Sequence, residues 1–414
     1  MVPQSPPEQA PAPATTGAHR IMREVNRGIV LDILRSGGRL SRVELARQAG
    51  LSKPTVSNIV EHLLREGLVR EVGTRPTLPQ GGRPPSLLEY NGAALSLVGV
   101  HFGVHHTHVA LADAVGTVLA RVAEPAVLGD PQRSVRQVRR MVRSLVAAGG
   151  DEAGTLRHAG VSVPGPIDPT TGRCIVAPNL GWRDEPVRDM LAAALGIPTT
   201  SANLTSVAAL AEGKLGAARG VRSYAWVYTG TGIGAGLVMN GEIFTGGSGH
   251  TGEVGHCPVV EGGELCNCGN RGCLETVAGS LAITRWANEA LRRGDSTLLR
   301  DHDGPLDAEV VARMAGRGDR VAQDILRDAG AHLGRGIAYL LNIVGPEMVV
   351  IGGPLVQAGD LYLDAISQAA AHTLLQRPVP VVASTLGPHA GLLGAVQLAV
   401  DASSRSYRIV GAAS

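Results

Sequence analysis

Three segments, in each of which an apolar run leads directly into a glycine-rich turn, do most to constrain the fold of this chain of 414 residues. Their sequences are HAGVSVPGPID, YAWVYTGTGIGAGLVMNG and EMVVIGGPL. Helical patterns lie around them, at residues 131–149, 185–195, 204–218, 276–293, 307–317 and 319–342. Strands that alternate with helices in this way predict an α/β fold that binds its ligand at the strand ends. Because the glycine-rich turns recur in both halves, we expect two similar lobes around a cleft.

Positive charge is concentrated near the N-terminus, although the whole chain has a formal net charge of only +2. Residues 20–83 hold twelve Lys or Arg and six acidic side chains, a net charge of +6. A basic module on a nearly neutral body fits contact with a polyanion. The core must be aliphatic, because 44% of the residues are hydrophobic but only 3% are aromatic.

The basic module has the pattern of a winged helix-turn-helix over residues 19–90. A first helix is expected over VNRGIVLDILRSGG, and a second begins at a capping box formed by Ser41 and Glu44. Ser52 is the expected cap of a third helix, which follows after a tight turn. The strand–loop–strand pattern of LVREVGTRPTLPQGGRPPSLLEYN predicts the wing.

The third helix would enter the major groove of DNA with its first residues facing the base edges. Asn suits adenine, whereas Lys suits guanine or phosphate. The expected DNA contacts, including an arginine at the wing tip, are Arg42, Lys53, Thr55, Ser57, Asn58 and Arg83. We expect a homodimer or homotetramer on a palindromic operator in double-stranded DNA. The alternative is that the outline is only a three-helix packing unit.

Three cysteines are crowded into CNCGNRGCLE, which follows ten residues after a histidine. Three thiolates and an imidazole complete the tetrahedral shell of a structural Zn²⁺, while two glycines allow the tight turns that this needs. The predicted ligands are His256, Cys266, Cys268 and Cys273. A redox pair is more usually Cys-x-x-Cys, and unligated buried thiols are the other alternative. Cys174 and Cys257 are expected to be ordinary buried thiols.

The cellular location is expected to be the cytoplasm. Five cysteines, an odd number with four of them between residues 257 and 273, make a poor disulfide framework. Residues 1–18 are rich in Pro and Ala and lack the basic start and apolar stretch of a secretory signal, so a disordered tail is expected. No apolar run reaches the roughly 20 residues of a membrane span.

The stretch GEVGH followed by CNCGNRGCLE resembles the ROK family, which groups sugar-responsive repressors with bacterial sugar kinases. The family element Cys-x-Cys-Gly-x-x-Gly-Cys-x-Glu is matched completely, and residues 227–256 follow the family's glycine-rich signature. The resemblance covers residues 95–414, and the winged helix in front matches the repressor branch. It implies that residues 91–414 form a two-lobed actin- and hexokinase-like domain of the ribonuclease-H-like α/β class.

In this family the sugar hydroxyls are held by the Glu and His of the Glu-x-Gly-His element and by the Glu that closes the cysteine motif. The resemblance thus implies Glu253, His256 and Glu275 as sugar-binding residues, with zinc fixing the orientation of the His256 ring. It adds Gly165 beside the sugar and Asn203, which corresponds to the Asn of the kinases' Asn-Asp pair. Salt bridging or helix capping is the alternative role of the two glutamates.

Two departures from the kinases argue against phosphoryl transfer. Leu204 stands where the kinases have the catalytic Asp, and leucine cannot take the proton of the attacked hydroxyl. In the first phosphate loop, Asp-x-Gly-Gly-Thr in the kinases, His101, Val104 and His105 replace the Asp, the second Gly and the Thr. We therefore expect no enzymatic activity, but a repressor of carbohydrate uptake or catabolism genes that a sugar in the cleft releases or modulates. The alternatives are an active sugar kinase that also binds DNA, and a regulator controlled by protein docking.

Overall fold

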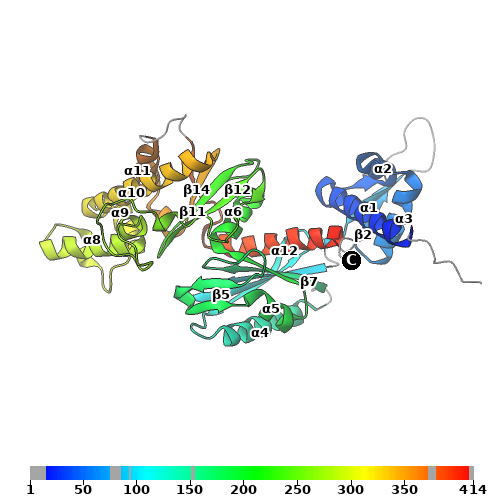
Figure 1. Cartoon of the computed structure of the whole chain (residues 1–414), viewed down its shortest axis with the longest axis horizontal. Coiled ribbons are helices and arrows are strands. Elements are labelled where there is room, and N and C mark those ends of the chain that lie inside the picture. Colours follow the sequence, from blue (N-terminus) through cyan, green and yellow to red (C-terminus); the bar gives the residue numbers. More distant parts are fainter. Residues whose placement is uncertain (1–14, 75–84, 93–94, 151–153, 372–378, 410–414) are drawn as a thin grey trace, which may run out of the picture.

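The computed structural model describes residues 15–74, 85–92, 95–150, 154–371 and 379–409. Along the chain it consists of a winged helix, a first lobe and a second lobe (Figure 1). The last helix returns from the second lobe, runs across the first and ends beside the winged helix (Figure 1). None of the helices in the described ranges is both long and apolar enough to cross a membrane.

The N-terminal unit is the winged helix-turn-helix that the sequence predicts. Its helices and strands, in chain order, are α1 (Thr15–Gly37), β1 (Leu40–Ser41), α2 (Arg42–Ala49), α3 (Lys53–Arg65), β2 (Val69–Thr74) and β3 (Ser86–Tyr90). The three strands form one antiparallel sheet in the order β1-β3-β2. The capping box is confirmed, because the Ser41 hydroxyl accepts the Glu44 N–H at 3.3 Å and the Glu44 carboxylate accepts the Ser41 N–H at 2.8 Å.

The first helix starts earlier than the sequence suggested. Helix α1 begins at Thr15, within the segment that we expected to be a disordered tail, and residues 1–14 of that tail lie outside the described residues. The core below α1 is formed by fully or nearly fully buried aliphatic side chains, among them Val30, Leu34, Val56 and Leu63. Their spacing along α1 and α3 places them on one face of each helix.

The two lobes are built on five-stranded sheets of the same topology. In lobe I, three antiparallel strands are followed by two parallel ones: β4 (Leu95–Phe102), β5 (His106–Asp113), β6 (Val118–Pro125), β7 (Thr155–Val163) and β10 (Thr199–Asn203). Lobe II repeats this arrangement with β11 (Tyr224–Thr229), β12 (Ile233–Met239), β13 (Glu242–Ile243), β14 (Met348–Gly352) and β15 (Val381–Ala383). The repeated topology confirms the two-lobed α/β fold. A separate pair, β8 (Cys174–Ala177) and β9 (Trp182–Glu185), extends lobe I.

Helices cover both faces of the two sheets. The outer face of sheet I carries α4 (Pro131–Gly149) and α5 (Val187–Leu195). Lobe II carries α7 (Glu275–Ala278), α8 (Ser280–Arg293), α9 (Ala308–Gly316), α10 (Arg320–Val344) and α11 (Asp360–Ala371). Every predicted helical segment is present, although the segment 276–293 is interrupted at Gly279, between α7 and α8. The sequence did not predict α11 or the C-terminal α12 (Ala390–Ile409).

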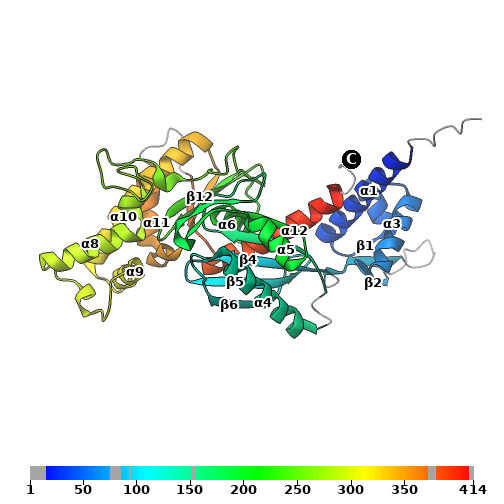
Figure 2. The ribbon, with the colours of Figure 1, turned by 60° about the horizontal axis from the view of Figure 1, so that its bottom comes forward.

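The lobes are joined by α6 (Leu204–Leu215) and α12, which pack against each other between the two sheets (Figure 2). Glycines bring the backbones into direct contact. A Cβ atom on Gly394 of α12 would lie 2.0 Å from the carbonyl oxygen of Val207 in α6. On the other side of α12, a Cβ atom on Gly160 of β7 would lie 2.0 Å from the carbonyl oxygen of Ala395. Helix α12 is therefore fixed against both sheet I and α6.

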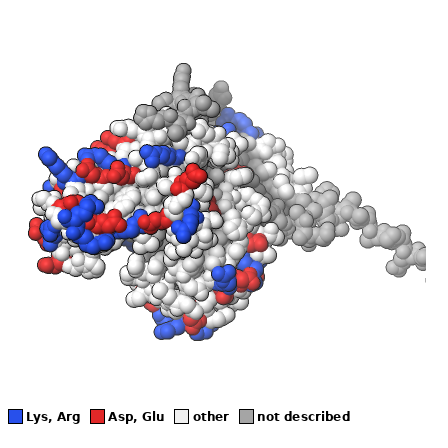
Figure 3. All heavy atoms as spheres, turned by 60° about the vertical axis from the view of Figure 1, so that its left-hand side comes forward, with Lys and Arg blue, Asp and Glu red and all other residues white. Residues whose placement is uncertain are grey.

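Charges of both signs are interleaved on the outer face of lobe II (Figure 3). Several of them form ion pairs within or beside α8 and α10, such as Arg293 with Asp295 at 2.8 Å and Arg285 with Glu289 at 3.9 Å. A mixed surface of this kind does not present the uniform positive potential that attracts a polyanion. This face therefore does not compete with the basic N-terminal module as a site for DNA.

The contact between α12 and sheet I is testable with one methyl group. Gly160→Ala places that methyl group against the backbone of α12, and overpacking of this kind costs about 1–3 kcal/mol. We expect a lower midpoint in urea denaturation. Gly316→Ala is the matched control, because a Cβ atom there has no neighbour within 4 Å and the backbone is helical. Equal midpoints for Gly160→Ala and the unmodified chain would contradict the described packing.

Candidate effector and metal site

The four predicted metal ligands lie together. One ligand atom from each of His256, Cys266, Cys268 and Cys273 can be chosen so that all four lie within 4.8 Å of one another. The Sγ of Cys266 is 3.6 Å from His256 Nδ1, and the Sγ atoms of Cys268 and Cys273 are 3.6 Å apart. Burial raises the pKa of the Cys273 thiol to about 12, so this sulfur needs a nearby cation to act as a thiolate. The cluster has the donor set of a metal site.

The backbone around the cluster is folded into small antiparallel bridges, Pro258 with Cys273 and Leu265 with Arg271. Gly272 has a φ of +71°, and a Cβ atom on it would lie 1.8 Å from the carbonyl oxygen of Val260. Only glycine fits this position, which explains one of the two glycines of the motif.

The two remaining cysteines differ from each other. Cys174 is buried, as predicted, but Cys257 is exposed, so the prediction of a buried thiol is wrong there. Cys257 has extended backbone, and its carbonyl oxygen accepts the N–H of Leu274. The side chain that follows His256 in the chain therefore faces solvent and not the cluster.

Three predicted sugar-binding residues of lobe II adjoin the cluster. His256 directs Nδ1 toward Cys266, while its Nε2 lies 4.0 Å from a carboxylate oxygen of Glu253. Glu275, the first residue of α7, accepts the N–H of Ile233 at 3.1 Å. Burial raises the pKa of Glu253, and the charge of Glu275 raises it further, while His256 opposes both effects. The two carboxylates and the imidazole thus share one partly buried site.

The predicted residue Asn203 of lobe I is linked to the same region. It ends β10 and caps α6, and its side-chain oxygen lies 2.6 Å from the Thr205 hydroxyl and accepts the Thr205 N–H at 2.7 Å. The Thr205 hydroxyl also lies 3.1 Å from the carbonyl oxygen of Ala235. The N–H of Ala235 in turn donates to the carbonyl oxygen of Gly252 at 2.7 Å. Gly252 directly precedes Glu253 in the chain. Three hydrogen bonds in series therefore connect Asn203 with the segment that carries Glu253.

Gly165 is held by packing within lobe I. A Cβ atom on it would lie 2.2 Å from the carbonyl oxygen of Val176 in β8, which by itself requires glycine. Its role beside a sugar stays a prediction. The loop that follows does reach lobe II, because a Cβ atom on Gly249 would lie 2.2 Å from the carbonyl oxygen of Ile167. The predicted sugar-binding residues thus lie on segments from both lobes that contact each other.

The two departures from the kinase pattern lie side by side. A Cβ atom on Gly391, near the start of α12, would lie 2.7 Å from Leu204 Cδ1 and 2.9 Å from His101 Nδ1. His101 Nδ1 is 3.1 Å from the Ser162 hydroxyl, and burial lowers the pKa of His101 to about 4. A leucine and a neutral imidazole therefore stand together where the resemblance places two carboxylates. The sequence could not reveal this, because the contact depends on an unpredicted helix.

The predicted DNA contacts of α3 lie at its first turns. Lys53 and Asn58 are exposed, and Ser57 is partly exposed beside them. The Thr55 hydroxyl is 2.8 Å from the Ser52 hydroxyl at the helix cap. Helix α3 lies on the side of the winged helix that faces away from the two lobes, where a DNA duplex would meet no obstruction from them (Figures 1 and 2).

The two predicted arginine contacts have different outcomes. Arg42 forms an ion pair with Glu71 of β2 at 3.1 Å, with both side chains partly exposed, so a phosphate would have to compete with this carboxylate. Arg83 lies outside the described residues.

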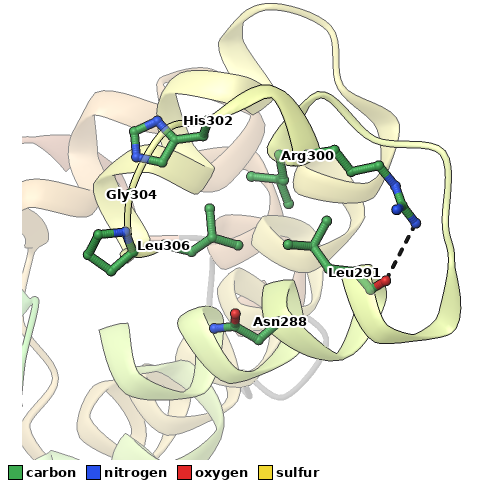
Figure 4. Close-up of a pocket in the computed structure, with 8 residues that line it drawn as sticks. Asn288, Leu291, Arg300, His302, Gly304 and Leu306 are labelled. Atoms are coloured by element: carbon green, nitrogen blue, oxygen red, sulfur yellow. Dashed lines mark hydrogen bonds between the residues drawn. The ribbon is translucent and has the colours of Figure 1, made fainter.

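A small pocket of about 350 Å³ lies apart from these residues, between α8 and the segment 298–306 (Figure 4). Leu291 and Leu306 line it, whereas the Arg300 guanidinium reaches the Leu291 carbonyl oxygen at 3.4 Å (Figure 4). None of the predicted sugar-binding or metal-binding residues lines this pocket, so it adds nothing to the candidate site.

Comparison with known proteins supports both parts of the chain. The model of the ROK family matches residues 97–402, and that of the IclR helix-turn-helix domain matches residues 29–73. The chain is 32% identical to the putative xylose repressor of Caldicellulosiruptor sp. strain Rt8B.4, over 93% of this chain and 98% of that protein.

Solved structures give the same result. A ROK family transcriptional regulator described as a homologue of the E. coli MLC protein matches with a TM-score of 0.83 and 25% identity, over 94% of this chain and 99% of that one. A ROK family glucokinase from Streptomyces griseus, in complex with glucose and AMPPNP, matches with a TM-score of 0.65 and 29% identity, over 74% of this chain and 99% of that one. The chain belongs to the ROK family and carries a helix-turn-helix domain in front of its ROK domain.

Proposed function

We propose that this protein is a sugar-responsive transcriptional regulator that represses genes of carbohydrate uptake or catabolism and is not an enzyme. One observation carries the proposal: an exposed recognition helix shares a chain with a ROK domain in which Leu204 and a neutral His101 stand at the two carboxylate positions of the kinases. A full-length relative named as a xylose repressor supports it.

The effector is a sugar bound by Glu253, His256, Glu275 and Asn203, with Gly165 at its edge. Carboxylates accept paired hydrogen bonds from neighbouring hydroxyls, and such charge-assisted bonds are the strongest available to a neutral sugar. Glu253 and Glu275 are partly buried, so little bulk water competes for them. His256 offers Nε2 to the ligand because its Nδ1 faces the cysteines.

The ion bound by His256, Cys266, Cys268 and Cys273 is a structural Zn²⁺. Three sulfurs and one imidazole nitrogen form the closed tetrahedral shell that zinc prefers. When bound, zinc supplies a fixed positive charge that keeps the thiols deprotonated and orients the His256 ring. The cluster thereby holds one wall of the sugar site in place.

The winged helix binds a palindromic operator as part of a homodimer or homotetramer. The half-sites lie about 10 base pairs or a multiple of this apart, so that two recognition helices meet the same side of the duplex. Lys53, Thr55, Ser57 and Asn58 face the base edges, while Arg42 and Arg83 contact the backbone or minor groove. The protein works in the cytoplasm, where the cluster thiols stay reduced.

Release of the operator by a sugar tests the proposed function. The operator is identified by genome-wide mapping of the bound protein, and its duplex is then titrated at fixed salt with and without D-xylose, D-glucose or N-acetyl-D-glucosamine. We expect one sugar to raise the thermal midpoint and to weaken operator binding. Glu253→Gln should weaken binding of that sugar by about 10- to 100-fold, since a hydrogen bond to a charged group is worth about 1.5–3 kcal/mol.

Glu261→Gln is the matched control, because Glu261 is an exposed carboxylate in the same segment. It should leave sugar affinity unchanged. The proposal fails if no mono- or oligosaccharide stabilises the protein while a protein partner captured from the cell changes operator binding. That result would favour control by docking.

Metal content tests the zinc assignment. Elemental analysis of the purified protein should find one zinc per chain, and Cys268→Ser should lose it and lower the thermal midpoint. Cys257→Ser should keep the zinc, because Cys257 is exposed and not part of the cluster. Full zinc content in Cys268→Ser, or none in the unmodified chain, would contradict the assignment.

A coupled ATP assay with a panel of hexoses and pentoses tests the absence of kinase activity. We expect no turnover above the protein-free rate, because Leu204 cannot act as the general base. Sugar-dependent ATP turnover that Glu253→Gln abolishes would show instead that the protein is a kinase with a DNA-binding domain.

A further inference from the structure

The geometry points to α12 as the element that carries the state of the sugar site to the winged helix. This inference rests on the proposed function and concerns how that function is regulated. The start of α12 contacts Leu204, the residue that follows the proposed sugar-binding residue Asn203, and the other end of α12 lies beside the winged helix (Figures 1 and 2).

The start of α12 is tightly packed against its neighbours. Gly391 is in direct contact with Leu204, which follows the proposed sugar-binding residue Asn203 in the chain, and with the ring of His101. One turn further along, Gly394 meets the backbone of Val207. Any shift of the first turn of α6 on sugar binding must therefore displace the start of α12.

The rest of α12 can move with its first turn as one rigid element. A helix of 20 residues is about 30 Å long. Its side chains Val396 and Ala399 are fully buried, and Gly99 and Gly160 of sheet I allow its backbone to lie directly on the strands. Asp401, just past the middle of the helix, lies 3.7 Å from Lys214 of α6.

The middle of α12 rests on the turn between β5 and β6. A Cβ atom on Gly116 of this turn would lie 2.6 Å from the side-chain nitrogen of Gln397 and 3.2 Å from Val400 Cγ2. Asp113 shapes the turn, because its carboxylate accepts the N–H groups of Val115 at 3.0 Å and Thr117 at 2.8 Å. A displacement of α12 therefore moves this turn.

The same turn holds the winged helix. The carbonyl oxygen of Ala114 accepts a hydrogen bond from Nη2 of Arg35 in α1 at 2.7 Å. The N–H of Ala114 donates to the carbonyl oxygen of Gly92 at 3.1 Å. The Ala114 side chain is buried in the apolar core of the winged helix. The Arg35 guanidinium also lies over the Tyr90 ring, 5.0 Å from its centroid.

The joint between winged helix and lobe I is incompletely packed. A pocket of about 370 Å³ lies beside the Arg35–Ala114 contact and is lined by residues of both parts, including Leu34, Tyr90, Asp113 and Val115. Because small interfaces between domains permit relative motion, a displaced turn can reorient the winged helix without breaking a core. Reorientation changes the distance between the two recognition helices of a dimer, and thus operator affinity.

The test measures the ratio of the operator dissociation constants with and without sugar. The probes are the mapped operator duplex and the sugar that gives the largest thermal stabilisation among D-xylose, D-glucose and N-acetyl-D-glucosamine. We expect a ratio of about 5–150 for the unmodified chain. Arg35→Met, which removes the hydrogen bond to Ala114, should bring the ratio below about 2. Sugar affinity measured without DNA should stay unchanged.

Arg39→Met is the matched control. Arg39 belongs to the winged helix as well, but it pairs with Glu89 of the same domain at 3.4 Å. Arg39→Met should leave the ratio unchanged even where it weakens DNA binding, since such weakening affects both dissociation constants equally.

A second pair of variants addresses the turn independently of Arg35. Asp113→Ala removes the acceptor that shapes the turn and should lower the ratio as Arg35→Met does. Asp113→Asn keeps an oxygen at that place and should preserve the ratio.

Three outcomes count against the inference. If Arg35→Met and Asp113→Ala both keep the ratio of dissociation constants of the unmodified chain, the inference about α12 is wrong and the proposed function is unaffected. Weakened sugar affinity in the DNA-free variants also overturns it, because the residues would then act on the sugar site. No effect of any sugar on operator binding by the unmodified chain overturns the proposed function and the inference together.

Discussion

The direct backbone contact between α6 and α12 is the constraint on which the rest of the structure depends. Two sheets of the same topology pack on either side of this pair, and Gly394 leaves no side chain between the helices. Protein interiors are too closely packed to absorb a shift at such a contact by compression. The same contact therefore holds the lobes together and places Leu204, the first residue of α6, against the start of α12.

The candidate site has two parts, the cysteine cluster with its neighbouring glutamates and the pair Leu204 and His101. His256 lies between the sulfur of Cys266 and the carboxylate of Glu253, in the arrangement that the proposed sugar site requires. At the other side, Leu204 and His101 remove two negative charges from the place where the kinases carry out catalysis. Under the proposed function, a fold shared by kinases and regulators keeps its ligand-binding groups, while Leu204 and His101 replace the groups that phosphoryl transfer needs.

Local signals in the sequence predicted local structure well. The caps Ser41 and Ser52 mark the starts of α2 and α3, and the spacing of the cysteines brings four donor atoms together. Helix α12 was missed because Gly391 and Gly394 suggest a turn, whereas in the structure they allow close helix packing. The contact of His101 with the start of α12, and the exposure of Cys257, depend on tertiary packing that no periodicity records.

Under the proposed function, sugar and operator favour different states of one chain. Linkage requires the effect to be reciprocal, so the most direct measurement is calorimetric titration of the effector sugar into the free protein and into the protein saturated with operator duplex. This reciprocity predicts that operator weakens sugar binding by the same factor, about 5–150, by which sugar weakens operator binding. Equal sugar affinity in the two titrations would contradict it.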